Sequence, residues 1–216
     1  MKILLAGDST VARCPSYEYP MSGWGNELAP FVSQWGAVYN FAKGGVSTET
    51  FRDEGLWALL LAELGQGDVV LLQFGHNDQK RSHLGPETGY RSNLERMITE
   101  VVAGGSQPVL CTPVERRNFI DGRQRLTLAA YADAVRRIGR RQQVPVIELN
   151  DWTAALYDTA GENGSIAYFT HLEPGSHAHW PDGLLDDTHF NCTGAAEVAG
   201  HVARELALIC NKVAVA

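Results

Sequence analysis

The chain has 216 residues, of which 44% are hydrophobic, and a formal net charge of −7. The hydrophobic content is ordinary for a globular protein and is sufficient for a sizeable core. The negative charge argues against general binding to nucleic acid or to an anionic membrane surface, and no apolar run reaches the length of a membrane span. We therefore expect neither nucleic acid nor a membrane as a partner.

The N-terminus and the cysteines bear on the cellular compartment. A predicted strand begins at Lys2, which leaves no room for a signal peptide with its own apolar segment and cleavage site. We expect a cytoplasmic protein, with secretion only if a leader has been removed. The cysteines lack metal-ligand spacing, so packed, idle thiols are expected, although their even number leaves disulfides open for an exported protein. They are Cys14, Cys111, Cys192 and Cys210.

Apolar runs predict the strands, and each run is continuously apolar, as expected for strands buried on both faces. The predicted strands are residues 2–6, 37–42, 68–74, 108–112 and 144–149, and helical patterns occupy 48–64, 86–103, 124–141, 151–160 and 193–212. Strands that alternate with helices favour a parallel sheet with right-handed crossovers. We therefore predict one three-layer α/β/α domain over residues 1–216, with a five-stranded parallel sheet.

Residues 161–188 show no clear periodicity. A loop of this length in a compact domain is usually functional or disordered.

The first predicted strand ends in Gly7-Asp8-Ser9-Thr10. In an open α/β sheet, ligands bind beyond the carboxyl ends of the strands, so Ser9 would stand at the mouth of such a crevice. Asp, Ser and Thr also cap helices well, and this stretch taken alone favours a helix cap. The stretches that follow reverse that preference.

The second and third predicted strands are followed by Gly44-Gly45 and Gly75-His76-Asn77-Asp78. Glycine lets the backbone turn sharply and lets a ligand approach closely. A tetrahedral intermediate of acyl transfer needs two or three hydrogen-bond donors at its oxyanion. The backbone N–H groups of Ser9 and Gly45 and the side-chain amide of Asn77 are candidates for this task.

A serine hydroxyl becomes an effective nucleophile only when a base accepts its proton. The candidate base is His189, in the stretch Asp186-Asp187-Thr188-His189-Phe190-Asn191. An Asp three residues before a His on a tight turn can accept the imidazole Nδ1–H, which leaves Nε2 for the serine. Asn191 would then cap the last helix. The Asp-x-x-His pattern by itself favours a solvent-facing pair.

In this order, the blocks Gly-Asp-Ser-Thr, Gly-Gly, Gly-His-Asn-Asp and Asp-x-x-His resemble those of the SGNH (GDSL-type) hydrolases, and their spacing covers nearly the whole chain. Within this superfamily the chain is similar to the rhamnogalacturonan acetylesterase group of carbohydrate esterases. The finer resemblance rests on Phe74-Gly75-His76-Asn77-Asp78, on Thr112-Pro113-Val114-Glu115-Arg116-Arg117, and on Asp187-Thr188-His189-Phe190-Asn191 followed by Gly194-Ala195. It implies a flavodoxin-like α/β/α fold and a serine esterase without a metal or another cofactor.

The resemblance also implies roles. Ser9 would be the nucleophile, His189 the general base and then acid, and Asp186 the residue that orients His189. The oxyanion hole would consist of the Ser9 and Gly45 N–H groups and Asn77. Gly44 is a rival of Gly45, and Gly45 is chosen because Gly-Val-Ser follows the family's block. Asp187 is a rival of Asp186, and Asp186 is chosen because the family's aspartate lies three residues before the histidine. Asp8 and Asp78 would hold the loops in shape.

We therefore expect an acetylesterase whose substrate is an acetylated oligosaccharide from plant cell walls, with rhamnogalacturonan fragments favoured. A xylan acetylesterase and a GDSL-type lipid esterase or thioesterase are the alternatives. A carbohydrate-binding protein without turnover is a third, and the intact set of blocks argues against it.

Several further residues are candidates for substrate binding. Arg116 and Arg117, together with Arg123 and Arg125, form a basic cluster that suits either a uronic acid carboxylate or plain solvation. Trp180 is a candidate for stacking on sugar rings, whereas Trp24 and Trp152 are expected in the core.

The histidine-containing segment before the Asp-x-x-His block carries His171, His177, His179 and Asp182. A metal site there is conceivable, but the spacing fits no standard zinc signature, so loop packing or sugar contact is expected, with His171 a candidate. Cys14 and His201 are expected to be structural.

Overall fold

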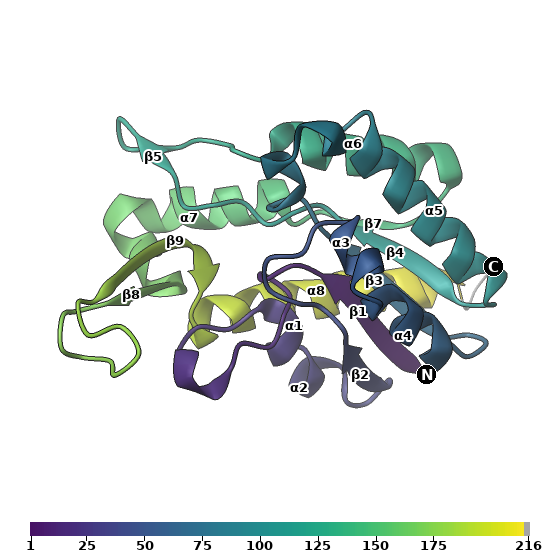
Figure 1. Ribbon diagram of the computed structural model, residues 1–216, viewed down its shortest axis with the longest axis horizontal. Helices are drawn as coiled ribbons and strands as arrows, with labels where there is room; N and C mark the ends of the chain where they lie inside the picture. Colours follow the sequence, from purple (N-terminus) through teal and green to yellow (C-terminus); the bar gives the residue numbers. More distant parts are fainter. Residues whose placement is uncertain (214–216) are drawn as a thin grey trace.

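A parallel five-stranded sheet in the order β2-β1-β3-β4-β7 forms the centre of the molecule (Figure 1). This computed structural model describes residues 1–213, so the last three residues of the predicted domain 1–216 lie outside the described residues. The strands of the sheet are β1 (Lys2–Gly7), β2 (Ala37–Asn40), β3 (Val69–Gln73), β4 (Gln107–Cys111) and β7 (Val146–Ile147). This order is that of flavodoxin-like folds, so the predicted fold class is confirmed.

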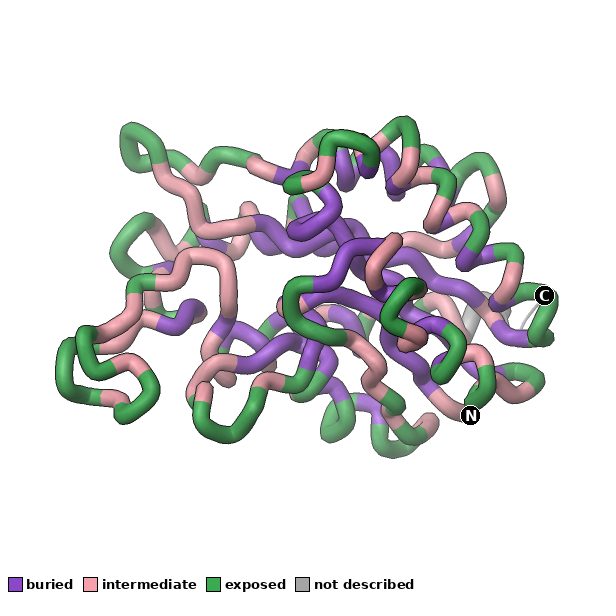
Figure 2. Tube along the Cα trace, viewed as in Figure 1, coloured by how far each residue is buried: buried purple, intermediate pink, exposed green. Residues whose placement is uncertain are grey.

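Helices cover both faces of the sheet. They are α1 (Trp24–Glu27), α2 (Ala29–Val32), α3 (Thr50–Asp53), α4 (Leu56–Glu63), α5 (Gly89–Ala103), α6 (Ala129–Gln142), α7 (Asn150–Gly164) and α8 (Cys192–Val213). Ile3 and Leu5 of β1 pack with side chains of α1, α2, α7 and α8, whereas Leu4 packs with side chains of α3 to α6. Successive side chains of a strand point to opposite faces, so one apolar run feeds two cores. Figure 2 shows the central strands as buried tubes inside a more exposed shell.

The edge strand β2 departs from the prediction of burial on both faces. Its residues alternate between exposed and half-buried because only β1 pairs with it. The strand predicted at 144–149 is also shorter, since only Val146 and Ile147 pair with β4.

Glycines mark one difference between the predicted and observed helices and one agreement. The helix predicted over 48–64 is interrupted at Gly55, whose φ of +79° is incompatible with a right-handed helix, and this separates α3 from α4. In α7 the regular helix breaks at Gly161, where φ is 73° and ψ is 171°. The sequence predicts the end of a helix at that glycine.

The helix predicted from residue 124 begins later, at Ala129. Residues before it form a hairpin of β5 (Phe119–Ile120) and β6 (Arg123–Gln124), whose turn residues Asp121 and Gly122 both have positive φ. Asp-Gly is a typical sequence for such a turn, and it was the available signal for this hairpin.

The prediction of an irregular segment over 161–188 is wrong in part. β8 (Phe169–Leu172) and β9 (Leu184–Phe190) form a separate antiparallel pair within and just beyond it. β9 is polar over most of its length and lies outside the central sheet, so it lacks the apolar run that marks the other strands. The cap predicted for α8 is confirmed, because Asn191 Oδ1 accepts the Gly194 N–H at 3.0 Å.

Within residues 1–213, no helix has both the length and the apolar character that crossing a bilayer requires.

Candidate active site

The carboxyl edge of the sheet gathers the glycine-containing loops. β1 lies between β2 and β3, so the segments that follow these strands are neighbours, although they are far apart in sequence. Ser9, Gly45 and Asn77 all line one cavity of about 750 Å³ at this edge. The cavity is therefore built at the point where the fold favours ligand binding.

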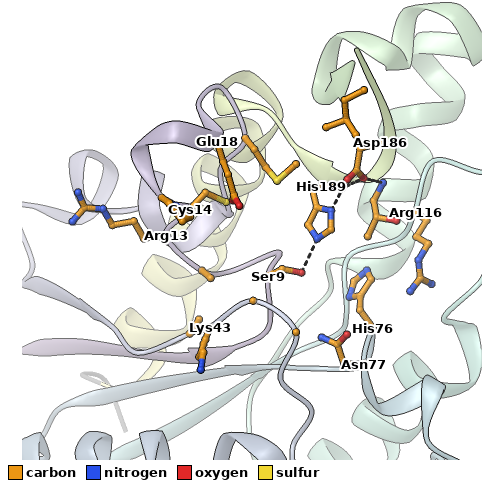
Figure 3. A pocket seen from close by; sticks show the side chains of 18 of the residues that line it. Ser9, Arg13, Cys14, Glu18, Lys43, His76, Asn77, Arg116, Asp186 and His189 are labelled. Carbon is orange, nitrogen blue, oxygen red and sulfur yellow. Dashed lines mark hydrogen bonds and ion pairs between the residues drawn. The ribbon is translucent and has the colours of Figure 1, made fainter. Parts of the chain in front are cut away.

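Ser9, His189 and Asp186 form a chain of hydrogen bonds at the wall of this cavity (Figure 3). Ser9 Oγ lies 2.9 Å from His189 Nε2, and His189 Nδ1 lies 2.7 Å from Asp186 Oδ2. A carboxylate can only accept, so Nδ1 carries the proton and Nε2 is left to accept the serine hydroxyl. A hydroxyl in this environment is set up to lose its proton to the imidazole as it attacks an electrophile.

Asp186 is held in place by the backbone of its own strand. Its Oδ1 accepts the N–H groups of Thr188 at 2.8 Å and His189 at 2.7 Å. Burial alone would raise the pKa of Asp186, but hydrogen bonds and charge interaction with His189 outweigh it, and the pKa lies below its usual value. The ionised form of Asp186 is thus favoured, and its Oδ2 accepts from His189 Nδ1. The sequence predicts Asp186 and His189 on a tight turn, whereas both residues lie within β9. The two bonds to Asp186 Oδ1 bend the strand locally in place of that turn.

Asn77 is oriented by two contacts. Its Nδ2 donates to the Val46 carbonyl at 3.0 Å and its Oδ1 accepts from Lys80 Nζ at 3.0 Å. An amide nitrogen has two hydrogens, so one N–H remains for a ligand in the cavity.

Gly45 has a φ of +81°, which explains a glycine there. Among the described residues, neither the Ser9 N–H nor the Gly45 N–H donates a hydrogen bond. Both groups are therefore free to act as donors to a bound oxyanion.

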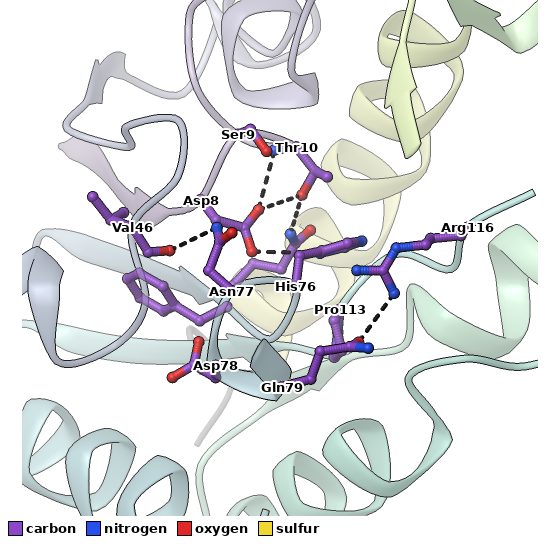
Figure 4. A network of polar contacts seen from close by, with 12 residues as sticks. Asp8, Ser9, Thr10, Val46, His76, Asn77, Asp78, Gln79, Pro113 and Arg116 are labelled. Atoms are coloured by element: carbon purple, nitrogen blue, oxygen red, sulfur yellow. Dashed lines mark hydrogen bonds and ion pairs between the residues drawn. The ribbon is translucent and has the colours of Figure 1, made fainter. Parts of the chain in front are cut away.

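Two buried aspartates brace these loops, and Figure 4 shows the contacts of Asp8 and the place of Asp78. Asp8 Oδ1 accepts the N–H and the hydroxyl of Thr10, at 3.1 and 2.8 Å, which shapes the turn that carries Ser9. Asp78 Oδ1 accepts the N–H and hydroxyl of Thr48, at 3.1 and 2.6 Å, and joins the loop after β3 to the segment after Gly45. Burial raises the pKa of Asp78 to about 6, against the effect of the Thr48 bonds. These contacts agree with the supporting role expected for both residues.

His76 links the two loops. The side chain is nearly buried, its Nδ1 lies 3.4 Å from Asp8 Oδ2, and the residue lines the cavity beside Asn77. Burial raises the pKa of Asp8, but His76 and Thr10 lower it more, so the net shift is downward. In the sequence His76 stands out only as part of the Gly75-His76-Asn77-Asp78 motif, and its position directly after a predicted strand is the signal that marks it.

The candidate substrate-binding residues divide into two groups. Arg116 and Trp180 line the cavity. Arg117 and His171 do not line it, and both contact Asp187 Oδ1 at 2.9 Å. Arg117 also bonds Ser165 Oγ at 3.0 Å, and its backbone N–H donates to the Asp187 carbonyl at 2.9 Å. The second aspartate thus ties neighbouring segments to β9, whereas the first contacts His189.

The remaining residues singled out from sequence are accounted for by packing. Trp24 is fully buried and donates to Gln73 Oε1 at 2.7 Å, and Trp152 stacks on His201 with ring centroids 4.2 Å apart. Burial and the nearby Glu18 raise the pKa of Cys14 to about 11, so this thiol is not a thiolate nucleophile at neutral pH. Within residues 1–213, no three His, Cys, Asp or Glu side chains gather as metal ligands would.

Several cavity residues went unnoticed in the sequence. Arg13, Lys43 and Lys80 line the cavity with Arg116 and give it a cationic lining. Lys43 directly precedes Gly44-Gly45 and Lys80 follows Asp78 by two residues, so their positions after strand ends were informative.

Comparison with known proteins shows the family of the chain. A model described as the GDSL-like Lipase/Acylhydrolase family matches residues 5–196. Over 204 residues the chain is 41% identical to the rhamnogalacturonan acetylesterase RhgT of Bacillus subtilis strain 168, covering 94% of this chain and 88% of that protein. The chain belongs to the GDSL-like lipase/acylhydrolase family, and the resemblance to SGNH hydrolases is confirmed.

Solved structures share the fold. Protein YxiM of Bacillus subtilis superposes with a TM-score of 0.81 at 25% identity, over 95% of this chain and 55% of that one. This chain thus spans about half of YxiM. The acetylxylan esterase Axe2 of Geobacillus stearothermophilus gives a TM-score of 0.64 at 17% identity, over 94% and 93% of the two chains.

Proposed function

We propose that this protein is a serine esterase that removes O-acetyl groups from plant cell-wall oligosaccharides, with rhamnogalacturonan fragments as the preferred substrate. The observation that carries the proposal is the hydrogen-bonded chain from Ser9 through His189 to Asp186, open to a cavity large enough for part of an oligosaccharide. The 41% identical rhamnogalacturonan acetylesterase of Bacillus subtilis supports the substrate class.

The reaction has two halves. In the first, Ser9 Oγ attacks the acetyl carbonyl carbon while His189 Nε2 accepts the hydroxyl proton. The Ser9 and Gly45 N–H groups and the free Asn77 N–H donate to the oxygen that becomes negative. His189 then gives its proton to the sugar oxygen as the carbon–oxygen bond breaks, which releases the sugar alcohol and leaves acetyl-Ser9.

In the second half, water replaces the sugar. His189 accepts a proton from the water as its oxygen attacks the acetyl carbonyl, and the same donors hold the second oxyanion. Collapse of this intermediate returns the proton to Ser9 Oγ and releases acetic acid. Asp186 stays ionised throughout and stabilises the imidazolium in both halves.

The charge of the cavity favours an acidic glycan. Arg13, Lys43, Lys80 and Arg116 line it together with two acidic side chains, Glu18 and Asp186. Lys43 pairs with Glu54 at 2.6 Å and Asp186 with His189 at 2.7 Å, which among the described residues leaves three cations against the carboxylate of Glu18. Rhamnogalacturonan carries uronic acid carboxylates, whereas an unsubstituted xylan chain carries none. This difference is why we rank rhamnogalacturonan above xylan.

The test is acetate release from a panel of acetylated rhamnogalacturonan and xylan oligosaccharides, beside p-nitrophenyl esters of increasing chain length. We expect the highest kcat/KM on rhamnogalacturonan fragments, and among the simple esters on acetate. Higher activity on longer acyl chains would contradict the proposal in favour of a lipid esterase or thioesterase, and higher activity on xylan fragments would transfer the preference to xylan.

Ser9→Ala supplies the control for the chemistry. Removing the nucleophile should lower kcat by a factor on the order of 10⁶ and abolish labelling by a fluorophosphonate. A variant that keeps a tenth of wild-type activity would exclude Ser9 as the nucleophile.

A further inference from the structure

A second, shallow and widely open cavity with an aromatic wall lies near the active-site cavity. Its volume is about 550 Å³, and Ser16, Tyr17, Tyr19, His177, Ala178 and His179 line it. Tyr17 and Tyr19 are 58% and 66% exposed. Single exposed aromatic residues are ordinary on protein surfaces, but two tyrosines that share a concave wall with histidines indicate a binding surface.

Three of the aromatic side chains form a continuous series that reaches the active site, and Tyr19 lines the second cavity beside them. Tyr17 lies 4.8 Å from His179 between ring centroids, and His179 lies 4.8 Å from Trp180. Trp180 in turn lines the cavity that holds Ser9 and His189. We call Tyr17, Tyr19, His179 and Trp180 the aromatic ridge.

The two loops that form the aromatic ridge are fastened to each other. His177 Nε2 donates to the Tyr19 carbonyl at 2.6 Å, and His177 Nδ1 accepts the His179 N–H at 3.1 Å. Both bonds together require the neutral histidine with its proton on Nε2. The Tyr19–His177 contact joins the segment after β1 to the loop between β8 and β9. Figure 1 shows the β8–β9 loop at one end of the molecule. These bonds hold the two loops together without a ligand, which lowers the entropic cost of binding across both of them.

The same two loops also wall the active-site cavity. Pro15 and Glu18 from the first loop and Trp180 from the second line it, while Ser16 and Tyr17 line the second cavity. A chain molecule bound at Ser9 that leaves the active site on this side therefore crosses the aromatic ridge.

We propose that the aromatic ridge is a second glycan subsite, which holds a pyranose ring of the oligosaccharide some units away from the acetylated sugar. One face of a pyranose ring carries C–H groups that pack on an aromatic ring, and its hydroxyls hydrogen-bond polar tips such as tyrosine hydroxyls and imidazoles. The aromatic ridge offers both aromatic faces and polar tips. Because Trp180 also lines the active-site cavity, we take the occupant to be a glycan long enough to reach from Ser9 to the ridge. This inference rests on the proposed function for the identity of the glycan.

The test measures binding separately from turnover. Isothermal titration with a deacetylated rhamnogalacturonan hexasaccharide reports on the subsite, because this probe has no ester to cleave. We expect the double variant Tyr17→Ala, Tyr19→Ala to bind it about tenfold more weakly than wild type, which corresponds to the loss of about one well-packed ring contact. Tyr39→Ala, at an exposed tyrosine of the edge strand β2, is the matched control and should bind like wild type.

The outcomes are distinguishable. Equal affinity of the double variant and wild type, or absence of hexasaccharide binding by wild type, would overturn the subsite. Loss of self-association in the double variant with unchanged glycan affinity would show instead that the ridge contacts a second copy of the chain. Failure of the proposed function would appear separately, as absence of acetate release from acetylated rhamnogalacturonan.

Discussion

Asp186 and Asp187 are adjacent in sequence but have different partners. Asp186 contacts His189 Nδ1 at 2.7 Å, whereas Asp187 contacts Arg117 and His171. The side chains of consecutive strand residues point in opposite directions, which separates the two carboxylates. Regular alternation would place Asp187, and not Asp186, on the side of His189. Asp186 reaches the imidazole because its Oδ1 accepts the N–H groups of Thr188 and His189, which bends the chain locally toward its own carboxylate.

This difference predicts unequal effects of two matching substitutions. Asp186→Asn should lower kcat by about 10⁴, because the amide cannot hold the imidazole in the required tautomer or stabilise its charge. Asp187→Asn should lower kcat less than about tenfold and act through stability, since it weakens a partly exposed ion pair of about 1 kcal/mol. The measurements are kcat on p-nitrophenyl acetate and the urea midpoint of each variant. Equal losses of kcat would contradict the distinct roles.

Glu100 shows how single residues join elements. From α5 it accepts both Arg52 Nη atoms from α3, at 2.7 and 2.9 Å, and Trp57 Nε1 from α4, at 2.5 Å. The hydrogen bonds from Arg52 lower the pKa of Glu100 to about 2, against the opposing effect of burial. One carboxylate thus holds the two short helices on either side of Gly55 against the long helix α5.

The lowered pKa predicts a defined pH dependence of stability. Because the folded state holds Glu100 ionised to lower pH than the unfolded chain, its stabilisation is present above pH 4.5 and is lost as the pH falls toward 2. Solvent reduces the effect of this partly exposed group, so Glu100→Gln should cost about 1 kcal/mol at pH 7. Urea unfolding of both proteins from pH 7 down to pH 3 is the measurement. A cost that does not shrink as the pH falls would refute the role of the charge.

At this scale the sequence predicts some elements well and others poorly. The central strands were predictable because burial on both faces leaves an uninterrupted apolar run, as in β3. β9 was missed because the polar residues 186–189 interrupt the apolar run that marks a buried strand. The break at Gly55 was missed because the apolar spacing on either side of it continues to fit one helix.

The residues of the candidate site also differ in how well the sequence predicts them. Ser9 and Asn77 were recognisable because they follow buried strands, whose ends the fold brings together. Arg117 was not separable from Arg116 by sequence, because the direction of each side chain depends on contacts with Asp187 and with Gln79. Tyr17 and Tyr19 belong to a loop whose partner, His177, lies far along the chain.

On the scale of the whole molecule, charge is distributed unevenly. The chain carries a net charge of −7, yet the active-site cavity has the cationic lining described above. The overall field repels an acidic glycan, so recognition of such a substrate depends on cations within contact distance. Arg116 is the strongest candidate, because Gln79 Oε1 and Thr127 Oγ1 each accept from its Nη1 at 3.0 Å and fix the guanidinium at the cavity wall.

We therefore predict that Arg116→Gln raises KM for an acetylated rhamnogalacturonan oligosaccharide about tenfold, the effect of one lost charged hydrogen bond. KM for an acetylated xylooligosaccharide should change less than about twofold, because that chain has no carboxylate for a guanidinium to bind. Arg123→Gln is the matched control, since Arg123 is exposed on the β5–β6 hairpin and does not line the cavity. Arg116→Lys keeps the charge and should restore part of the affinity, although an ammonium lacks the planar fork of arginine. A parallel rise of KM for both glycans in Arg116→Gln would mean that Arg116 shapes the cavity wall and does not recognise an acidic sugar.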